Sequence, residues 1–387
     1  MIYSFGAQNY FSFREGMSAS FQLSAKVPAS VAQGRRVSTV LGIKGGNASG
    51  KTNILKCLVF LQEFISTSFS LEDGDGLGFD TYFGNEEESN FYIDFKVGDV
   101  RYLYELTATP FAVVREALYK KLQRKTLIAE RVGNVIVERP NDYKALDFVE
   151  LKSNASLIST VAKYKIKDLP TAFADIVEYF GYMDGNVAKS GVVPDESMFK
   201  RDTASAFYYK VPEAFEFAKN IIKNSDLGIV DIEIHKSELS AGKVQYLPLF
   251  LHKVGKSDTT RYLTPFDQSS GTMALFRRLA MYWMVLDDGG VLIMDEFDQN
   301  CHPMLLPSLI KLFTDKDSNP KGAQFIFTAH NADIIDELGK YRTILVSKED
   351  GESYSYRLDE IPGDLIRNDR SIAALYREGK IGGIPRL

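Results

Sequence analysis

The sequence predicts an α/β fold in which a mixed sheet is joined by an antiparallel β lobe and a mostly helical insertion. An apolar strand is expected at 37–43. It runs into a glycine-rich loop, which is followed by helical spacing of apolar residues over 52–68. From about residue 78 to 140, apolar positions alternate with polar ones, which is the period of antiparallel strands. Residues 155–226 are mostly helix-like.

Further elements follow in chain order. Two short strands are expected at 2–5 and 18–23, and turn signals at Gly98-Asp99 and Gly133-Asn134 separate the hairpins of the β lobe. The strands of these hairpins are expected at 91–97, 101–108, 117–123 and 134–140. The second half is expected to hold strands at 228–238, 244–252, 291–294 and 324–328, and helices at 272–287 and about 304–314.

Composition fits a globular chain with a sizeable core, since 45% of the 387 residues are hydrophobic and 25% are charged. A formal net charge of −5 argues against a mainly electrostatic nucleic-acid binder but allows a local basic strip. The two cysteines, Cys57 and Cys301, belong to no C-x-x-C pair, which fits a reducing compartment. Neither a signal peptide nor a long apolar run is found. We therefore expect a cytoplasmic protein without a membrane span.

Residues 45–52, GGNASGKT, fit the phosphate-binding loop G-x-x-x-x-G-K-[ST] between the expected strand and helix. Backbone N–H groups of the glycine turn and of the helix N-terminus would hold phosphate oxygens. Lys51 would reach the β- and γ-phosphates, and the Thr52 hydroxyl would bind Mg²⁺. The candidate nucleotide-binding residues are Gly45, Gly46, Asn47, Ala48, Ser49, Gly50, Lys51, Thr52 and Asn53.

An acid pair follows the apolar strand in residues 289–296, GGVLIMDE. Four apolar residues fit a strand that is buried on both faces, and α/β sheets place ligands at the carboxyl ends of such strands. Asp295 would hold Mg²⁺, usually through water, and Glu296 would polarise an attacking water. An acid pair after a strand also has a purely structural interpretation, but the phosphate loop earlier in the chain favours the functional one.

Two further stretches have both a structural and a functional interpretation. The serines of Asp267-Gln268-Ser269-Ser270-Gly271-Thr272 would serve well as a helix N-cap. Alternatively, this stretch is a signature loop offered to the γ-phosphate of ATP held by another subunit, through Ser269, Ser270, Gly271 and Thr272. His330 ends the strand QFIFTAH about 35 residues after the acid pair. It is either structural or a switch histidine that contacts the γ-phosphate and the water at Glu296.

The order GGNASGKT, SSGT, VLIMDE and FTAH resembles the ATP-binding-cassette (ABC) ATPases, in the branch that includes SMC, RecF and OLD-type heads. Asn53 and Asp298 favour that branch. The resemblance implies an ABC-type P-loop NTPase head with a RecA-like sheet, in which the D-loop residue Asp298 lies at a dimer contact. The first part of the head, with the phosphate loop and the β lobe, would be 1–154. A helical insertion would follow at 155–226, and 227–387 would carry the signature, acid pair and histidine.

Most of the chain is also similar to the stand-alone AAA-type ATPases of bacterial abortive-infection and phage-defence operons. The shared motifs are Asn9-Tyr10-Phe11-Ser12-Phe13, residues 45–53, 269–272 and 295–298, His302-Pro303, residues 319–330 and Tyr376-Arg377-Glu378-Gly379-Lys380-Ile381-Gly382-Gly383-Ile384-Pro385. Three positions depart from the family pattern. Gln268 replaces the usual glutamate, and Cys301 occupies a normally aliphatic position. The first motif also lacks its frequent basic residue, which puts DNA contact through the first strand in doubt.

This resemblance implies an enzyme that binds and hydrolyses ATP with Mg²⁺ and closes as an ATP-sandwich homodimer or a higher even oligomer. Lys51, Glu296 and His330 would be catalytic, and Thr52 and Asp295 would hold the metal ion. The ATPase would regulate a separately encoded effector, a nuclease or toxin, in anti-phage defence. We expect no nuclease domain of its own, because the chain after His330 is shorter than the roughly one hundred residues that such a domain needs.

A RecF-like or SMC-like DNA-repair ATPase is the alternative. The missing heptads exclude SMC-like arms, but a DNA clamp stays open. Its best basic strip is Lys120, Lys121, Arg124, Lys125 and Arg131, which could also be a solvated hairpin face. A scaffold that binds ATP without hydrolysing it is a third possibility. His235 and His252 have no recognisable partners and are taken as structural. The acidic segment 349–360 is expected to form a hairpin or an exposed strand.

Overall fold

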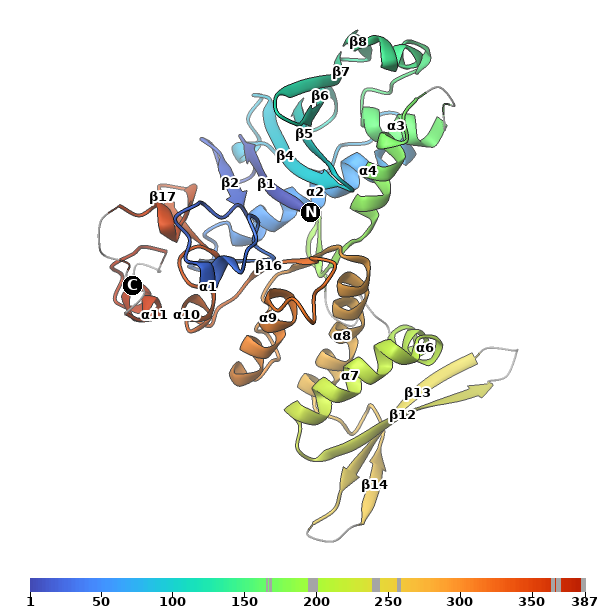
Figure 1. The fold of residues 1–387 in the computed structure, drawn as a ribbon, viewed down its shortest axis with the longest axis vertical. Coiled ribbons are helices and arrows are strands. Elements are labelled where there is room, and N and C mark those ends of the chain that lie inside the picture. Colours follow the sequence, from blue (N-terminus) through green and yellow to red (C-terminus); the bar gives the residue numbers. More distant parts are fainter. Residues whose placement is uncertain are drawn as a thin grey trace.

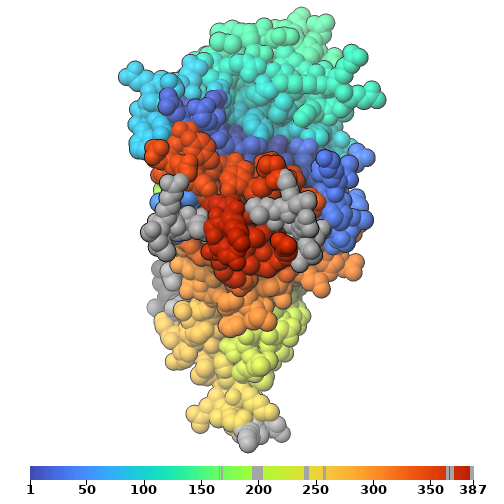
Figure 2. All heavy atoms as spheres, turned by 90° about the vertical axis from the view of Figure 1, so that its left-hand side faces the viewer, coloured from blue at the N-terminus to red at the C-terminus, as the bar shows by residue number. Residues whose placement is uncertain are grey.

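The computed structural model describes residues 1–164, 166, 169–193, 201–238, 244–255, 259–362, 366 and 370–383. The molecule is elongated: the β lobe lies at one end, a small three-stranded sheet lies at the other, and the central sheet lies between them (Figure 1). Figure 2 shows the same order from the side, with the C-terminal residues on the surface in the middle. Ile384 and Pro385 of the C-terminal family motif lie outside the described residues.

A six-stranded mixed sheet forms the centre of the molecule. Its order is β18-β17-β3-β16-β15-β9, and every strand is parallel to its neighbours except β18, which pairs antiparallel with β17. From edge to edge the strands are β18 (Glu352–Arg357), β17 (Thr343–Glu349), β3 (Val40–Gly45), β16 (Gln324–Thr328), β15 (Val291–Met294) and β9 (Met183–Gly185). The strands expected at 291–294 and 324–328 are confirmed. The strand expected at 37–43 begins later, because Val37 forms an isolated bridge with Gln22.

The helices lie beside the central sheet and beside the sheets at either end of the molecule (Figure 1). Their bounds are α1 (Ala29–Ala32), α2 (Lys51–Thr67), α3 (Leu157–Tyr164), α4 (Ala172–Gly181), α6 (Arg201–Lys210), α7 (Pro212–Ser225), α8 (Ser270–Asp288), α9 (Leu306–Thr314), α10 (Ile334–Leu338) and α11 (Ile372–Arg377). The helices expected over 52–68, 272–287 and about 304–314 are confirmed to within two residues at each end.

Alternate residues of the central strands face two separate cores. Val291 and Ile293 pack in a core shared with α2 and the β lobe. Leu292 and Met294 pack in a second core with α7, α8 and α9. Because both faces of β15 are covered, all four of its residues must be apolar. This requirement explains the continuous apolar run that made the strand recognisable in the sequence.

The β lobe is a seven-stranded antiparallel sheet in the order β2-β1-β4-β5-β6-β7-β8. Its strands are β1 (Ile2–Gln8), β2 (Met17–Ser20), β4 (Ser89–Val97), β5 (Val100–Ala108), β6 (Val113–Lys121), β7 (Lys125–Val132) and β8 (Val135–Glu138). The predicted antiparallel lobe is confirmed. The sequence did not predict β7, because a charged residue, Arg131, occupies one of its buried positions.

Arg131 lies in the core of the lobe, in an ion pair with Glu116 on the neighbouring strand. Its Nε lies 2.7 Å from the Glu116 carboxylate, and both side chains are fully buried. The Arg131 guanidinium also donates to the carbonyls of Lys152 and Ala155. The Glu116 carboxylate accepts hydrogen bonds from the Tyr104 hydroxyl. Both members of the pair thus have further hydrogen-bond partners, which offset part of the cost of burying their charges.

Replacing Arg131 with methionine is expected to lower the free energy of unfolding by about 3–5 kcal/mol, because Glu116 would stay buried without its cation. Urea unfolding followed by circular dichroism measures this change. Lys96→Met, which breaks the exposed pair with Asp99, is the matched control and should leave stability nearly unchanged. Equal effects of the two substitutions would contradict the prediction.

The insertion at 155–226 is largely helical, as expected, but it also contains short strands. These are β9, β10 (Val187–Ala188) and β11 (Gly191–Val192). β9 pairs in parallel with β15 and forms one edge of the central sheet. Gly185 permits this pairing, since an added Cβ would lie 1.8 Å from the Ile293 carbonyl oxygen. A strand of three residues is too short to show a period in the sequence.

A three-stranded sheet of β12 (Ile229–Glu238), β13 (Val244–Lys253) and β14 (Thr260–Leu263) follows the insertion. The strands expected at 228–238 and 244–252 are confirmed. The segment 349–360 contributes to a hairpin, also as expected, formed by β17 and β18. However, β17 begins earlier than the sequence suggested. Its first four residues are buried inside the central sheet.

None of the helices in the described ranges has the length and apolar content needed to cross a bilayer. The mixed sheet, the phosphate loop after β3 and the antiparallel lobe confirm the predicted α/β fold. The domain boundaries at 154 and 226 stay a prediction.

Candidate functional site

The glycine-rich loop leaves the carboxyl end of β3 and enters α2. Gly45 is the last residue of β3, and Gly50 directly precedes α2. The first N–H groups of a helix have no partner within it, so together with the helix dipole they suit phosphate oxygens. Residues 48–53 line a polar cavity of about 190 Å³ with Ser12 and Lys348.

Both motif glycines are required by close contacts. A Cβ on Gly45 would lie 2.4 Å from the carbonyl oxygen of Val346 on the adjacent strand. Gly50 has a φ of +105°, and a Cβ there would lie 2.8 Å from the Ser353 hydroxyl and 2.9 Å from that of Ser12. Glycine is the residue that meets both conditions. The loop therefore holds its shape because β17, β18 and the turn that carries Ser12 pack against it.

Lys51, the first residue of α2, folds over the loop. Its Nζ donates to the carbonyls of Gly45 at 3.1 Å and Gly46 at 2.8 Å. Burial lowers the pKa of Lys51, and the nearby carboxylates, first of them Asp295, oppose that shift. The cation is thus held over the glycine turn, where phosphate groups would lie, and it faces the acid pair.

Thr52 and Asp295 meet although 243 positions separate them in the sequence. The Thr52 hydroxyl donates to Asp295 Oδ2 at 2.6 Å. The hydroxyl of Thr328, at the end of β16, donates to Asp295 Oδ1 and accepts from the Glu296 N–H at 2.9 Å. One hydroxyl and one carboxylate fit Mg²⁺, which binds through oxygen ligands and takes the rest from substrate phosphates and water. The described residues hold no cluster of three or more His, Cys, Asp or Glu side chains for a metal ion.

Asn186 holds the backbone of Asp295 and was missed by sequence analysis. The Asp295 N–H donates to Asn186 Oδ1 at 2.6 Å, and Asn186 Nδ2 donates to the Asp295 carbonyl at 2.9 Å. The asparagine is buried and directly follows β9, so the insertion fixes the position of the acid pair. No local pattern marks Asn186. The hydroxyl of Thr328 at a strand end is a signal that could have been noticed.

Glu296 and His330 lie opposite each other at the same edge of the sheet. Glu296 Oε1 lies 3.3 Å from His330 Nε2, and both side chains are about half exposed. Glu296 has a φ of +48°, an unfavourable left-handed conformation for a residue with a side chain. This turn lets the backbone leave β15 sharply. The carboxylate of Glu296 is thereby placed beside the imidazole, with access to water.

Asp298 holds the backbone of the turn that follows β16. Its carboxylate accepts from the His330 N–H at 3.0 and 2.9 Å and from the Asn331 N–H at 2.6 Å. The expected role at a dimer contact is untested. What the structure gives is an intramolecular contact that fixes the turn carrying His330.

The signature residues lie at a different cavity. Ser269 caps α8, since its hydroxyl accepts from the Thr272 N–H at 3.0 Å, so the N-cap interpretation is confirmed. Ser269, Gly271 and Thr272 line a cavity of about 520 Å³. None of the described residues lining it belongs to the phosphate loop, and none lining the loop cavity belongs to the signature. In one chain the phosphate loop and residues 269–272 therefore line different cavities.

Ser12, from the N-terminal family motif, links three parts of the site. Its hydroxyl accepts from Asn53 Nδ2 at 3.0 Å and lies 2.8 Å from the Ser353 hydroxyl. Asn53 thus anchors the start of α2 to the first strands of the lobe and to β18. The sequence pointed to both Asn53 and this motif, but not to their contact.

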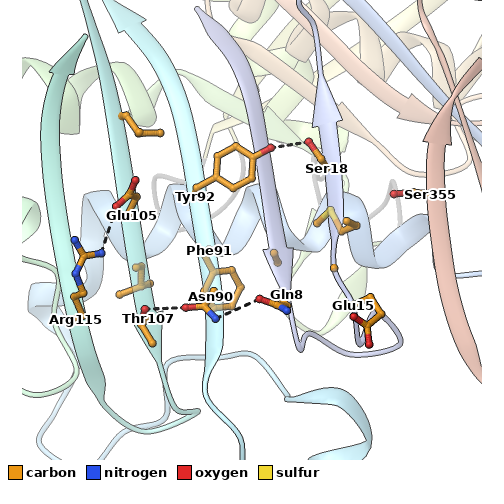
Figure 3. A pocket seen from close by; sticks show the side chains of 15 residues that line it. Gln8, Glu15, Ser18, Asn90, Phe91, Tyr92, Glu105, Thr107, Arg115 and Ser355 are labelled. Atoms are coloured by element: carbon orange, nitrogen blue, oxygen red, sulfur yellow. Dashed lines mark hydrogen bonds and ion pairs between the residues drawn. The ribbon is translucent and has the colours of Figure 1, made fainter. Parts of the chain in front are cut away.

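A larger cavity, of about 710 Å³, lies on the open face of the β lobe (Figure 3). Gln8, Asn90 and Thr107 form a hydrogen-bonded row across its strands. Its charged lining residues are Glu15, Glu105 and Arg115, and Arg115 is paired with Glu105. With two carboxylates and one guanidinium, this lining offers no excess of positive charge to a nucleic-acid backbone.

The predicted basic strip is wrong as a continuous surface. Arg131 is buried in the lobe core. Lys121 pairs with Asp94 at 2.5 Å, and Lys125 pairs with Glu105 at 2.6 Å. Lys121 and Lys125 face each other across β6 and β7, whereas a register shift in β7 turns Arg131 to the opposite, buried face beside Glu116.

The two histidines taken as structural both have partners. His252 Nε2 lies 2.6 Å from Nε2 of Gln268, the residue that departs from the family pattern before the signature. His235 lies 3.4 Å from Glu233 on the same exposed strand. Gln268 therefore ties the approach to the signature loop to strand β13.

Residues 40–336 match the family AAA_21, described as "AAA domain, putative AbiEii toxin, Type IV TA system". No curated protein matches the sequence.

Several solved structures are similar in outline, including two SMC heads and one ABC transporter component. An SMC head bound to the C-terminal winged-helix domain of ScpA has 14% identity and a TM-score of 0.45, over 93% of this chain and 98% of that chain. An SMC head with an extended coiled coil bound to the C-terminal domain of ScpA, derived from Pyrococcus furiosus, has 14% identity and a TM-score of 0.46, over 93% and 97%. The protein cbiO1 of Clostridium perfringens, part of the ABC transporter complex cbiONQ, has 12% identity and a TM-score of 0.35, over 93% and 90%.

Proposed function

The chain belongs to this AAA-domain family, and from that premise we propose that it is an ABC-type ATPase that hydrolyses ATP between two copies of the chain. One observation carries the proposal. The phosphate loop, the acid pair and His330 come from distant parts of the sequence and meet at one edge of the central sheet. A phosphate cradle, oxygen ligands for Mg²⁺ and an acid beside a water-accessible site are the parts that phosphoryl transfer needs.

ATP would bind with its phosphates on the loop between Gly45 and Thr52. The N–H groups at the start of α2 and the Lys51 ammonium would hold the β- and γ-phosphate oxygens. Thr52 and Asp295 would hold Mg²⁺, which when bound neutralises negative charge on the phosphates. Lys51 would exchange its two carbonyl contacts for contacts with phosphate oxygens.

Glu296 would orient a water molecule and accept its proton as the water oxygen attacks the γ-phosphorus. The bond from that phosphorus to the β–γ bridging oxygen breaks, which yields ADP and inorganic phosphate. His330 lies within reach of Glu296 and would contact the γ-phosphate. Thr328 would keep the acid pair in place through its contacts with Asp295 and Glu296.

A second copy would supply the signature loop. The separate cavities at the phosphate loop and at the signature support this, because each site is incomplete in one chain. Three exposed apolar side chains flank the signature cavity along the sequence: Leu227 is 92% exposed, Phe266 is 79% exposed and Met304 is 80% exposed. Leu227 also lines this cavity, and so exposed an apolar side chain there supports a protein contact. The N-terminus of α8 would then point Ser270 at the γ-phosphate of the partner's ATP.

Mixing two inactive variants tests the composite site. Lys51→Ala removes the phosphate-loop cation, and Ser270→Glu places a negative charge at the signature. Glutamate at the start of a helix is favourable for the helix, so α8 should stay folded. Each variant alone should show almost no ATP hydrolysis. A one-to-one mixture should recover about a quarter of the wild-type rate, because half of the dimers are mixed and each mixed dimer has one intact site.

The control is a mixture of Lys51→Ala with Glu296→Gln. Both changes disable the phosphate-loop half, so no mixed dimer gains an intact site. Its activity should stay at the level of the separate variants. Equal recovery in both mixtures, or full activity of Ser270→Glu alone, would contradict a site shared between copies.

The biological role that we propose is control of a separately encoded effector, a nuclease or toxin, in anti-phage defence. The family description refers to a toxin of a type IV toxin–antitoxin system, which supports a role of this class. Phage plating on cells that carry the native operon tests it. The wild-type operon should reduce plating, and operons with Lys51→Ala should not. Equal plating on both strains would contradict the role.

A further inference from the structure

A buried lysine next to the phosphate loop holds the turn that carries His330. Lys44 is the penultimate residue of β3 and directly precedes Gly45. It is 2% exposed. Its Nζ donates to the carbonyl oxygens of Ala329 at 2.8 Å and His330 at 2.6 Å. The ammonium also lies 5.5 Å from the ring centre of Tyr376, on α11.

The peptide groups of His330 are held on both sides by charged groups. The N–H of His330 donates to the Asp298 carboxylate, and the carbonyl accepts from Lys44. The imidazole itself is about half exposed and lies 3.3 Å from Glu296. With its backbone fixed at two points, the ring can change position only by rotating its side chain.

Lys44 also connects this turn to the phosphate loop. The carbonyl oxygen of the next residue, Gly45, accepts a hydrogen bond from Lys51 Nζ. In the proposed ATP-bound state Lys51 would leave that carbonyl, and the change would fall on the Gly45–Gly46 peptide, one residue after Lys44. Strand β3 pairs in parallel with β16, so their carboxyl ends lie side by side. The first end carries Lys44, and the second leads into the turn with His330.

We propose that Lys44 is a positioning residue that sets the His330 imidazole against Glu296 and links the phosphate loop to that histidine. This inference rests on the proposed ATPase function. Charge-assisted hydrogen bonds to two carbonyls are directional enough to fix a turn. Outer contacts of this kind, when removed, typically lower activity about 10- to 100-fold.

The surroundings of Lys44 give the inference a pH signature. Burial lowers the pKa of Lys44 to about 8, Asp298 opposes that shift, and Lys51 adds to it. The groups that face Lys44 from neighbouring elements are Asp298, Lys51, His330 and Tyr376. Lys44 thus carries its charge below about pH 8 and loses it above, so turnover should fall as pH rises through this value.

Two substitutions of Lys44 and one matched control test the inference. Lys44→Met should lower kcat about 10- to 100-fold while ATP affinity changes less than about threefold. Lys44→Arg keeps a cation above pH 8, so it should restore part of the rate and remove the alkaline decline. The control is Lys152→Met. Lys152 also donates to two backbone carbonyls, those of Phe69 and Leu71, and lies over the Phe69 ring, but in the segment between β8 and α3.

A spectroscopic arm separates this inference from the proposed function. Histidine labelled with ¹⁵N gives imidazole signals from four residues, and His330→Gln identifies the relevant one. Lys44→Met should move the His330 signals, and Lys152→Met should not, whether or not ATP is hydrolysed. Unchanged His330 signals in Lys44→Met would overturn the inference. So would equal loss of rate in Lys152→Met, or an alkaline decline that persists in Lys44→Arg. A wild type without hydrolysis would instead refute the proposed function.

Discussion

Replacing Lys51 with alanine is expected to weaken ATP binding by about 100-fold or more. The Lys51 ammonium lies over the glycine turn, where it donates to the carbonyls of Gly45 and Gly46. Hydrogen bonds from a cation to phosphate contribute about 1.5–3 kcal/mol, and about 2.7 kcal/mol corresponds to 100-fold in affinity. Titration with a fluorescent ATP analogue in the presence of Mg²⁺ measures the loss. The variant should stay folded, because the substitution removes a buried charge and no apolar contact of the core.

Lys56→Ala is the matched control for this prediction. Lys56 lies on the same helix, and its ammonium lies over the ring of Phe11, outside the loop cavity. We expect it to bind ATP with wild-type affinity. An affinity of Lys51→Ala equal to that of Lys56→Ala would show that the loop does not bind the nucleotide phosphates.

Replacing Glu296 with glutamine should leave ATP binding intact and lower hydrolysis by about 10²–10⁴-fold, the range for loss of a general base. The amide keeps the shape of the side chain and can still reach His330, but it cannot accept the proton of the attacking water. ATP would then stay bound between two copies. The variant should accumulate as a dimer with ATP, seen as a doubled mass in size-exclusion chromatography with light scattering.

Lys51→Ala serves as the control for the trapped state. Mixed with ATP it should stay at the mass of the wild type without nucleotide. Asp298→Asn gives a second comparison, since it weakens the contact that holds the His330 turn without removing the acid of the acid pair. Hydrolysis by Glu296→Gln at the wild-type rate would refute the assignment of Glu296 as the catalytic base.

The sequence alone determined the parts of the fold with strong local patterns. The apolar run at 291–294 predicted β15 with its observed bounds, because a strand covered on both faces must be apolar at every position. The phosphate loop was identified from its motif, and the structure gives the reason for one of its glycines, since Gly50 has a φ of +105°. These signals lie within a few neighbouring residues.

The tertiary structure alone decided which side chains serve the site around these motifs. Asn186 reaches Asp295 across 109 positions, and Lys44 reaches Ala329 across 285. Arg131 looked like a surface cation until its pairing with Glu116 placed it in the core. Such contacts depend on which strands become neighbours in a sheet, and a residue's own sequence neighbours carry no record of that. The chemical groups of the site were therefore readable from the sequence, while the contacts that hold them in place required the fold.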